Sequence, residues 1–438
     1  MTSKNSELLL QNYIKARQKK TLNDNPIELL PEHSHTYEHL DQDQKELRDL
    51  CLNFYTKHAA TGINPENNIA KIKPQKHANF AQKGLLDKME QYFTSLDASR
   101  TWMCFWSVHT LNIVNNGLIK NKLEILNFLK ACYNTNTGGF GGGPGQMSHL
   151  APTYSATNCI ASLDIEEGFQ FLKEIRASMV DFLAACYNCE NGSFVMHRDG
   201  ETDTRAVYCA ISVMKLLKLR EFQSQISSKN PEKSLSKIED MLQNEKTFNY
   251  LISCQTYEGG FAAAPGNEAH GGFTWCSLAA IALIQKDNEK VQELISNDKT
   301  IIRHLFSCLS WLARRQCPIS GGFNGRTNKL VDACYSFWQG SCFSLLENYI
   351  LKLDVNTKKN LIMNSTALAG YITACCQGKF GGLRDKPGKY PDYYHTSYGF
   401  SGYVCTDVGK EDENFNEICP LYNLTVGISE RLQKHLEL

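Results

Sequence analysis

Residues 125–163 read ILNFLKACYNTNTGGFGGGPGQMSHLAPTYSATNCIASL, and this stretch decides the fold. Apolar residues spaced as one face of a helix stand on both sides of the glycines: Ile125, Phe128, Leu129 and Cys132 before them, and Ala156, Cys159, Ile160 and Leu163 after them. The paired glycines at 138 and 139 suit a chain that leaves a helix through positive φ and turns tightly. Phe140 would then pack back into the core. The stretch therefore predicts a helix, a glycine-rich loop and a second helix.

The same unit recurs along the chain. The motif Gly-Gly-Phe or a close variant occurs at 138–140, 192–194, 259–261, 321–323 and 381–383, so that successive copies lie 54 to 67 residues apart. Each copy follows a helical pattern, whereas the alternation and the Asn-Gly turns typical of strands are scarce. The pattern predicts an all-α array of five to six helical hairpins. Its period leaves open whether the hairpins stack as an open solenoid or close into a ring.

The composition indicates a soluble globular protein. Of 438 residues, 42% are hydrophobic and 21% are charged, and the formal net charge is +0, which gives no basic excess for nucleic-acid binding. The N-terminus has no apolar region of a secretory signal, and no apolar run is long enough for a membrane span. The 17 cysteines are spread through the chain at apolar helical positions, which favours reduced thiols and a cytoplasmic location.

The composition also divides the chain into three regions. Residues 1–70 are polar with short apolar pieces, and we expect a partly helical or disordered arm there. Residues 71–425 hold the repeats and form the main helical domain, and residues 426–438 form a C-terminal tail. The charged segment 220–245 lengthens one repeat and is interpreted as a surface insertion.

A candidate metal site combines Asp332, Cys334 and His395. Oxygen, sulfur and nitrogen ligands together suit zinc, and three protein ligands leave the open fourth position of a catalytic zinc. Residues two apart point to different faces of a helix, so Asp332 and Cys334 could bind one ion only near a helix start or bend. Taken alone, these side chains fit packing roles as well. Arg326 and Lys329 would share a helix face if their segment is helical, which indicates an anion nearby.

Four long motifs resemble those of one family. GGFGGGPGQMSHLAPTY at 138–154, EAHGGFTWC at 268–276, GRTNKLVDACYSFWQG at 325–340 and GGLRDKPGKYPDYYHTSYGFSGY at 381–403 are similar, in this order, to the β subunits of protein farnesyltransferase. The resemblance covers roughly residues 95–425. It implies an α–α barrel (toroid) whose inner helices line a funnel, and an α subunit that wraps around the barrel in a heterodimer.

The resemblance also implies a role for each matching residue. Asp332, Cys334 and His395 match the ligands of one Zn²⁺. The groups that hold the isoprenoid diphosphate are matched by His270, Arg326, Lys329 and Tyr335. Positions that line the isoprenoid and peptide pocket are matched by Trp102, Trp106, Ala151, Tyr154, Arg205, Tyr208, Gly272, Cys276, Trp338 and Tyr394. Asp385 matches a carboxylate that assists the diphosphate through Mg²⁺, and Phe273 stands where the farnesyl enzymes usually have Tyr.

The implied activity is transfer of a farnesyl group from farnesyl diphosphate to the cysteine thiol of proteins that end in a CaaX sequence. The alternative is the β subunit of the type I geranylgeranyltransferase, which shares the zinc and diphosphate sites. Trp102 and Asp385 favour the farnesyl enzyme, because the rival has a small residue and Lys at these positions. Barrel cyclases need a D-x-D-D acid motif, which the sequence lacks, and a non-catalytic scaffold would lack the ligands and cations.

Overall fold

The computed structural model describes residues 38–59, 70–86, 91–115, 117–229, 236–352 and 363–437. Within these ranges the chain is mostly helical, which confirms the predicted all-α class. The inner helices are α4 (Arg100–Ile113), α6 (Leu150–Leu163), α9 (Thr204–Leu216), α13 (Gly271–Gln285), α16 (Tyr335–Trp338) with its continuation α17 (Gly340–Ser344) and a π-helical segment Leu345–Ile350, and α20 (Tyr393–Tyr403).

The remaining helices lie outside or connect the repeats. They are α2 (Glu38–Ala59), α3 (Pro74–Leu86), a 3-10 segment Gln91–Ser99, α5 (Lys122–Ala131), α7 (Glu166–Glu174), α8 (Arg176–Cys186), α10 (Leu219–Lys229), α11 (Ser236–Gln243), α12 (Glu245–Ser253), α14 (Glu289–Asn297), α15 (Lys299–Ala313), α19 (Ser365–Gly370) with a π-helical segment Tyr371–Cys375, α21 (Asp407–Glu411) and α22 (Ile428–Glu437). Of the expected N-terminal arm, residues 38–59 form α2, whereas 1–37 and 60–69 lie outside the described residues.

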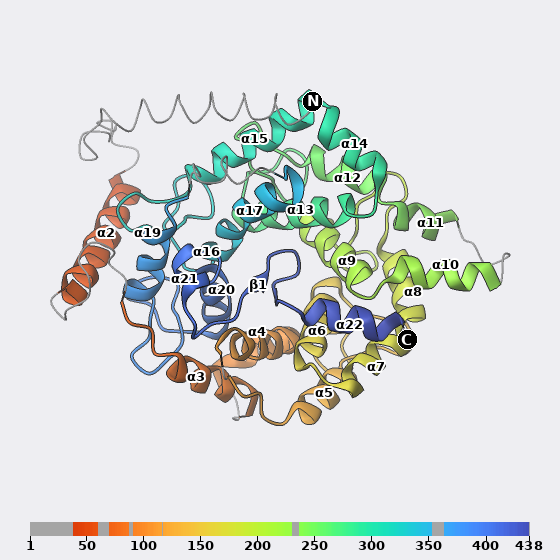
Figure 1. Cartoon of the computed structure of the whole chain (residues 1–438), viewed down its shortest axis with the longest axis horizontal. Coiled ribbons are helices and arrows are strands. Elements are labelled where there is room, and N and C mark those ends of the chain that lie inside the picture. The colour runs from red at the N-terminus through yellow and green to blue at the C-terminus, as the bar shows by residue number, and fades with distance from the viewer. Residues whose placement is uncertain are drawn as a thin grey trace.

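The inner helices form a closed ring (Figure 1). Helix α6 packs between α4 and α9, α9 packs on α13, and α13 contacts α16 and its continuation. Helix α20 then packs on both α16 and α4, so the hairpins close into a toroid and do not stack as an open solenoid. Helix α13 is buried along nearly its whole length, as expected for an apolar helix between the outer helices and the barrel interior.

The glycine-rich loops turn as the sequence predicts. Gly138 has a φ of 71°, and Phe140 is fully buried. The second glycine of the pair is needed for close packing, which the sequence did not reveal. A Cβ atom on Gly139 would lie 2.7 Å from the ring of Phe182 on the neighbouring helix α8. The same close approach to an aromatic ring recurs in later repeats: Gly260 with Trp311, and Gly322 with Tyr371.

A strand pair near the C-terminus crosses the middle of the ring (Figure 1). Strands β1 (Ile418–Cys419) and β2 (Leu424–Thr425) pair antiparallel, with Ile418 opposite Thr425. The segment before β1 is tied to the carboxyl end of α4, because Asn416 N–H donates to the carbonyl of Ile113 (2.7 Å). The strand pair therefore occupies the end of the barrel where the inner helices finish, and no pattern in the sequence indicated it.

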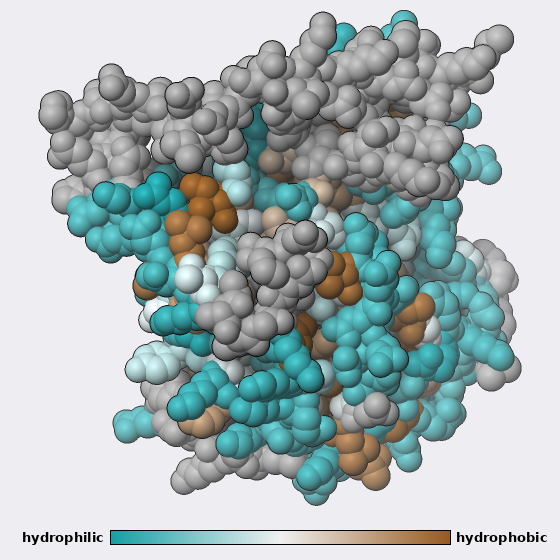
Figure 2. Space-filling model, turned by 60° about the vertical axis from the view of Figure 1, so that its left-hand side comes forward, coloured by the Kyte–Doolittle hydropathy of each residue, from teal (hydrophilic) through white to brown (hydrophobic). Residues whose placement is uncertain are grey.

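On the side of the molecule drawn in Figure 2, the described residues of the surface are mainly polar. Figure 2 shows one side of the molecule, on which hydrophobic residues lie in separate patches among hydrophilic ones. The segment interpreted as an insertion contains α10 and α11, which lie at the edge of the ring in Figure 1. None of the helices in the described ranges combines the length and apolar character that crossing a bilayer requires. All 17 cysteines are free.

Candidate active site

The amino ends of the inner helices meet at one rim of the ring. At each of four helix starts, an N–H group donates to the glycine-rich loop of the next repeat: Arg100 to Gly142 (2.9 Å), Leu150 to Met196 (2.7 Å), Thr204 to Ala263 (2.9 Å) and Gly271 to Gly325 (2.8 Å). Ala333, just before α16, donates in the same way to Asp385 (2.8 Å). This band of hydrogen bonds aligns the helix amino ends, whose partial positive charge favours anions.

Asp332, Cys334 and His395 come together at this rim. Their ligand atoms all lie within 4.8 Å of one another. Cys334 is the residue that precedes α16, so the two-residue spacing falls at a helix start, and Asp332 accepts a hydrogen bond from the Cys334 N–H (2.8 Å). Burial raises the pKa of the Cys334 thiol well above its usual value, and the charge of Asp332 adds to this effect. The three side chains thus form a compact N/O/S ligand set.

The ring of His395 is held in the orientation that a metal ligand needs. Its Nδ1 lies 2.6 Å from a carboxylate oxygen of Asp392 and donates its proton there, so Nε2 is the ring nitrogen available to a metal ion. Nε2 is buried, 3.2 Å from Asp332, and within the described ranges it has no aligned hydrogen-bond partner. Burial lowers the pKa of His395, but the carboxylates of Asp332 and Asp392 outweigh it and raise this pKa to about 10. Without a metal the ring therefore also carries a proton on Nε2, which a bound metal ion would displace. This buried nitrogen, beside a thiol and a carboxylate, is where a zinc ion fits.

Asp392 was not among the predicted residues. Its carboxylate also caps α20 by accepting the N–H of His395 (2.7 Å), so one side chain fixes both the helix start and the ligand ring. A carboxylate three residues before a candidate histidine ligand was the signal that would have identified it.

His270 and Tyr335 place two hydrogen-bond donors beside the candidate metal ligands. His270 caps α13, because its Nδ1 accepts the N–H of Gly272 (3.0 Å), and its proton therefore sits on Nε2. That Nε2 lies 2.9 Å from the Tyr335 hydroxyl. Burial, followed by the charge of Arg326, lowers the pKa of His270 to about 4. The ring is therefore neutral near neutral pH and acts as a donor without adding a charge.

Arg326 and Lys329 lie in a loop, so the shared helix face that a helical segment would have given them does not form. The chain turns at Asn328, which has a φ of 60°, and Gly325 is buried against the Tyr335 ring. Arg326 pairs with Glu268 (2.8 Å), with both side chains about half exposed, and Lys329 is exposed. Both cations are thus accessible from solvent at the rim.

Asp385 lies next to the candidate metal ligands. Its backbone carbonyl accepts hydrogen bonds from Ala333 N–H (2.8 Å) and from the Tyr371 hydroxyl (3.1 Å). One oxygen of its side chain contacts the Lys386 ammonium, while the other is buried without a hydrogen-bond partner in the described part of the chain. Burial raises the pKa of Asp385, and the charge of Asp332 adds to the rise. A divalent cation would satisfy the orphaned oxygen, so the site fits Mg²⁺.

A closed girdle of eight aromatic side chains surrounds the barrel interior. Neighbouring ring centroids lie 4.3 to 5.7 Å apart in the order Trp102, Trp106, Tyr394, Tyr398, Trp338, Trp275, Tyr208, Tyr154 and back to Trp102. Six of these residues were predicted to line the pocket, and Trp275 and Tyr398 were missed because nothing in their spacing separates them from core residues. The girdle gives the interior an apolar wall.

The strand pair forms the floor of this interior. The hydroxyl of Tyr154 donates to the carbonyl of Tyr422 (2.9 Å), and that of Tyr208 donates to the carbonyl of Leu421 (3.0 Å).

The other predicted pocket residues stand near the starts of α6, α9 and α13: Ala151, Arg205, Gly272 and Cys276. Phe273 packs 5.3 Å from the His270 ring, and the Arg205 guanidinium lies 5.6 Å from the centre of the Phe273 ring.

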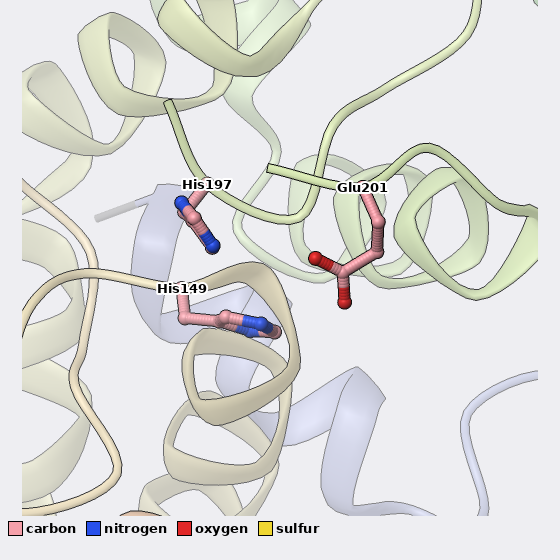
Figure 3. Close-up of side chains that lie close together, drawn as sticks. All are labelled: His149, His197 and Glu201. Atoms are coloured by element: carbon pink, nitrogen blue, oxygen red, sulfur yellow. The ribbon is translucent and has the colours of Figure 1, made fainter. Parts of the chain in front are cut away.

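A second group with ligand-like side chains lies at the same rim and was not predicted. His149, His197 and Glu201 point toward one another in Figure 3, and their ligand atoms lie within 4.8 Å. His149 caps α6, since its Nδ1 accepts the N–H of Ala151 (3.1 Å). The Nδ1 of His197 lies 2.9 Å from the carbonyl of Arg198 and donates to it. Glu201 is exposed.

Comparisons with known proteins agree with this architecture. The family model described as "Prenyltransferase alpha-alpha toroid domain" matches residues 72–424. The chain is 36% identical over 331 residues to the protein farnesyltransferase subunit beta of Schizosaccharomyces pombe, covering 75% of this chain and 76% of that protein. It is 32% identical over 404 residues to the protein farnesyltransferase subunit beta of Arabidopsis thaliana, covering 80% of this chain and 76% of that protein.

Geranylgeranyl enzymes are also similar. The Arabidopsis geranylgeranyl transferase type-1 subunit beta is 31% identical over 275 residues, covering 62% of each chain. A solved structure of the Candida albicans protein geranylgeranyltransferase-I complexed with GGPP superposes with a TM-score of 0.63 at 20% identity, covering 84% of this chain and 100% of that chain, which supports the fold alone. The toroid and the relatives together show that the chain is a prenyl transferase that belongs to the family of protein farnesyltransferase β subunits.

Proposed function

We propose that this chain is the catalytic β subunit of a zinc-dependent protein farnesyltransferase, which moves the farnesyl group of farnesyl diphosphate to the cysteine thiol of CaaX proteins. The observation that carries the proposal is the convergence of Asp332, Cys334 and His395 beside the donor pair His270 and Tyr335. Zinc bound there would hold the substrate thiol in its open position and lower the pKa of that thiol. A thiol acceptor and a leaving diphosphate would thus lie side by side at one rim.

The rim residues would act on the diphosphate. His270 and Tyr335 donate hydrogen bonds to its oxygens, and they are most valuable when the carbon–oxygen bond breaks and negative charge gathers there. Arg326 supplies a full charge once it exchanges Glu268 for the diphosphate. Lys329 and the aligned helix amino ends add to the positive potential. Asp385 would hold Mg²⁺ against the same group.

The aromatic girdle would hold the isoprenoid. Its rings cover an apolar interior closed at the far end by the strand pair, and burying each CH₂ of the isoprenoid contributes about 0.8 kcal/mol. Trp102 stands in the girdle between Trp106 and Tyr154, at centroid distances of 5.7 and 5.6 Å. An indole at this position reduces the room for a longer chain, which favours farnesyl over geranylgeranyl as the transferred group.

A competition between the two diphosphates tests the proposal. The chain is co-purified with its α subunit and zinc, and given a CaaX peptide together with equal farnesyl and geranylgeranyl diphosphate. We expect the wild type to transfer mainly farnesyl. Replacing Trp102 with Thr opens room for the extra isoprene unit and shifts the preference toward geranylgeranyl by about tenfold after packing losses. Zinc content and a thermal melt of each variant control for folding.

Two outcomes would contradict this assignment. A wild-type complex that prefers geranylgeranyl diphosphate would make the chain a type I geranylgeranyltransferase β subunit. Full transfer without any α subunit would remove the heterodimer from the proposal. The cytoplasmic location, the CaaX partners and residues 71–425 as the catalytic domain belong to the same proposal.

A further inference from the structure

The carboxylate of Asp385 has the ammonium group of a lysine beside it. Lys386 follows Asp385 in the chain, and its ammonium group contacts one oxygen of the Asp385 carboxylate. The exposed fractions of the two side chains are 15% and 19%, so the contact is largely shielded from water. Shielding matters, because an ion pair held away from water is screened far less than one on the surface.

The backbone around this pair is anchored on the metal ligands. The carbonyl of Asp385 accepts the N–H of Ala333, which lies between Asp332 and Cys334. The field of the carboxylate reaches the reacting groups as well: burial is the main reason that the pKa of Tyr335 is raised, and the charge of Asp385 contributes. The pair is therefore part of the site.

The two carboxylate oxygens of Asp385 differ in their hydrogen bonds. One is satisfied by Lys386, and the other is buried with no hydrogen-bond partner among the described residues. A divalent cation that binds this carboxylate would meet an ammonium group already in contact with it, and like charges at that separation repel strongly. The cation and Lys386 therefore compete for the same carboxylate.

We propose that Lys386 is the built-in counter-ion of Asp385, and that a divalent cation binds Asp385 by displacing its ammonium group. The inference rests on the proposed function, since it assigns Lys386 as a positioning residue for the metal-assisted diphosphate. Released from Asp385, the ammonium is free to pair with the incoming diphosphate. The cation and the diphosphate then favour each other's binding. The cation displaces the Lys386 ammonium group from Asp385, and the diphosphate supplies a new partner for that ammonium group.

Manganese binding followed by electron paramagnetic resonance tests this competition directly. The zinc-loaded complex with the α subunit is titrated with Mn²⁺ without peptide, so that no turnover occurs, in the absence and presence of farnesyl diphosphate. The variants are Lys386→Met, which keeps the aliphatic stem and removes the charge, and Lys389→Met, which removes the same charge from an exposed residue of the same loop. Lys386→Met combined with Asp385→Asn identifies the bound site.

Without diphosphate, we expect Lys386→Met to bind Mn²⁺ about tenfold more tightly than the wild type, and Lys389→Met to stay within about twofold. The gain should disappear in the double variant, and farnesyl diphosphate should narrow the gap between Lys386→Met and wild type. Equal Mn²⁺ affinity in Lys386→Met and wild type, or an equal gain in Lys389→Met, would overturn the proposal. Failure of farnesyl diphosphate to bind would contradict the proposed function instead, while the titrations without diphosphate would still decide the role of Lys386.

Discussion

Among the described residues, the rim carries two clusters of ligand-like side chains, and the two differ in the hydrogen bonds that their histidines make. In the cluster of Asp332, Cys334 and His395, the Nδ1 proton of His395 goes to a carboxylate, which leaves Nε2 facing the other candidate ligands, where a metal ion can take the place of its proton. In the cluster of His149, His197 and Glu201, the Nδ1 of His149 accepts a backbone N–H at 3.1 Å. A neutral His149 therefore carries its proton on Nε2.

This difference decides what each cluster can bind. A metal ligand needs a lone pair on the nitrogen that faces the ion, and the cap on α6 uses the only lone pair of a neutral His149. The second cluster thus offers the ion His197 and Glu201 but not His149, whereas the first offers all three residues. Proximity of suitable residue types is therefore not sufficient for a metal site. The ring nitrogen that faces away from the ion has to hold the proton, so that the nitrogen that faces the ion can bind it.

The largest expected effect is loss of the metal from the first cluster. Replacing Cys334 with Ala removes the thiolate ligand, and we expect the zinc content of the purified complex to fall from about one per chain to near zero. Binding of farnesyl diphosphate should persist, because His270, Tyr335 and the cations are untouched. Elemental analysis and a fluorescence binding assay measure the two quantities. Full zinc occupancy in the variant would exclude Cys334 from the site.

A smaller effect tests the hydrogen bond behind His395. Replacing Asp392 with Ala should lower zinc affinity by about 10- to 100-fold, because the ring loses the partner that fixes its tautomer. Asp298→Ala is the matched control: Asp298 also caps a helix, accepting the N–H of Thr300 (2.7 Å), but lies on outer helix α15. Both variants should lose about 1 kcal/mol of unfolding free energy with the cap. Equal zinc affinities in the two variants would show that Asp392 acts only as a cap.

The smallest effect is expected in the second cluster. We expect the wild-type complex to hold one zinc per chain in moderate excess of the metal, and His197→Ala to leave that number unchanged. Equilibrium dialysis followed by elemental analysis provides the stoichiometry. Two zinc ions per chain in the wild type, falling to one in His197→Ala, would make the second cluster a metal site and break the comparison.

Local patterns predicted the repeats well, because each helix, loop and buried phenylalanine depends on neighbours in the sequence. Gly138 and Phe140 took the conformation and burial expected from a single motif. No such local pattern predicted that the ring closes. Closure depends on α20 packing against α4, two helices far apart in the chain, and only the resemblance to a family implied it.

The candidate site was predictable in its residue types but not in its hydrogen bonds. Asp332, Cys334 and His395 were named from ligand chemistry and resemblance, and the structure brings them together. Asp392 had one signal, its place three residues before His395, but the proposed role of Lys386 could not be inferred from the sequence, since a lysine on a loop is ordinarily solvated. The roles of both residues depend on the burial of their side chains and on the atoms that these side chains contact.

Closure by the last inner helix and by the strand pair has a consequence for synthesis of the chain. Helix α20 and strands β1 and β2 leave the ribosome after all the other inner helices, yet they complete the ring against α4 and form the floor of its interior. Until then the apolar girdle has no closed wall and remains open to solvent and to other chains. Contacts between such distant segments slow folding, and exposed apolar surface promotes aggregation. We expect nascent chains of this protein to depend on chaperones until α20 and the strand pair have been made, and truncations that remove these elements to be insoluble.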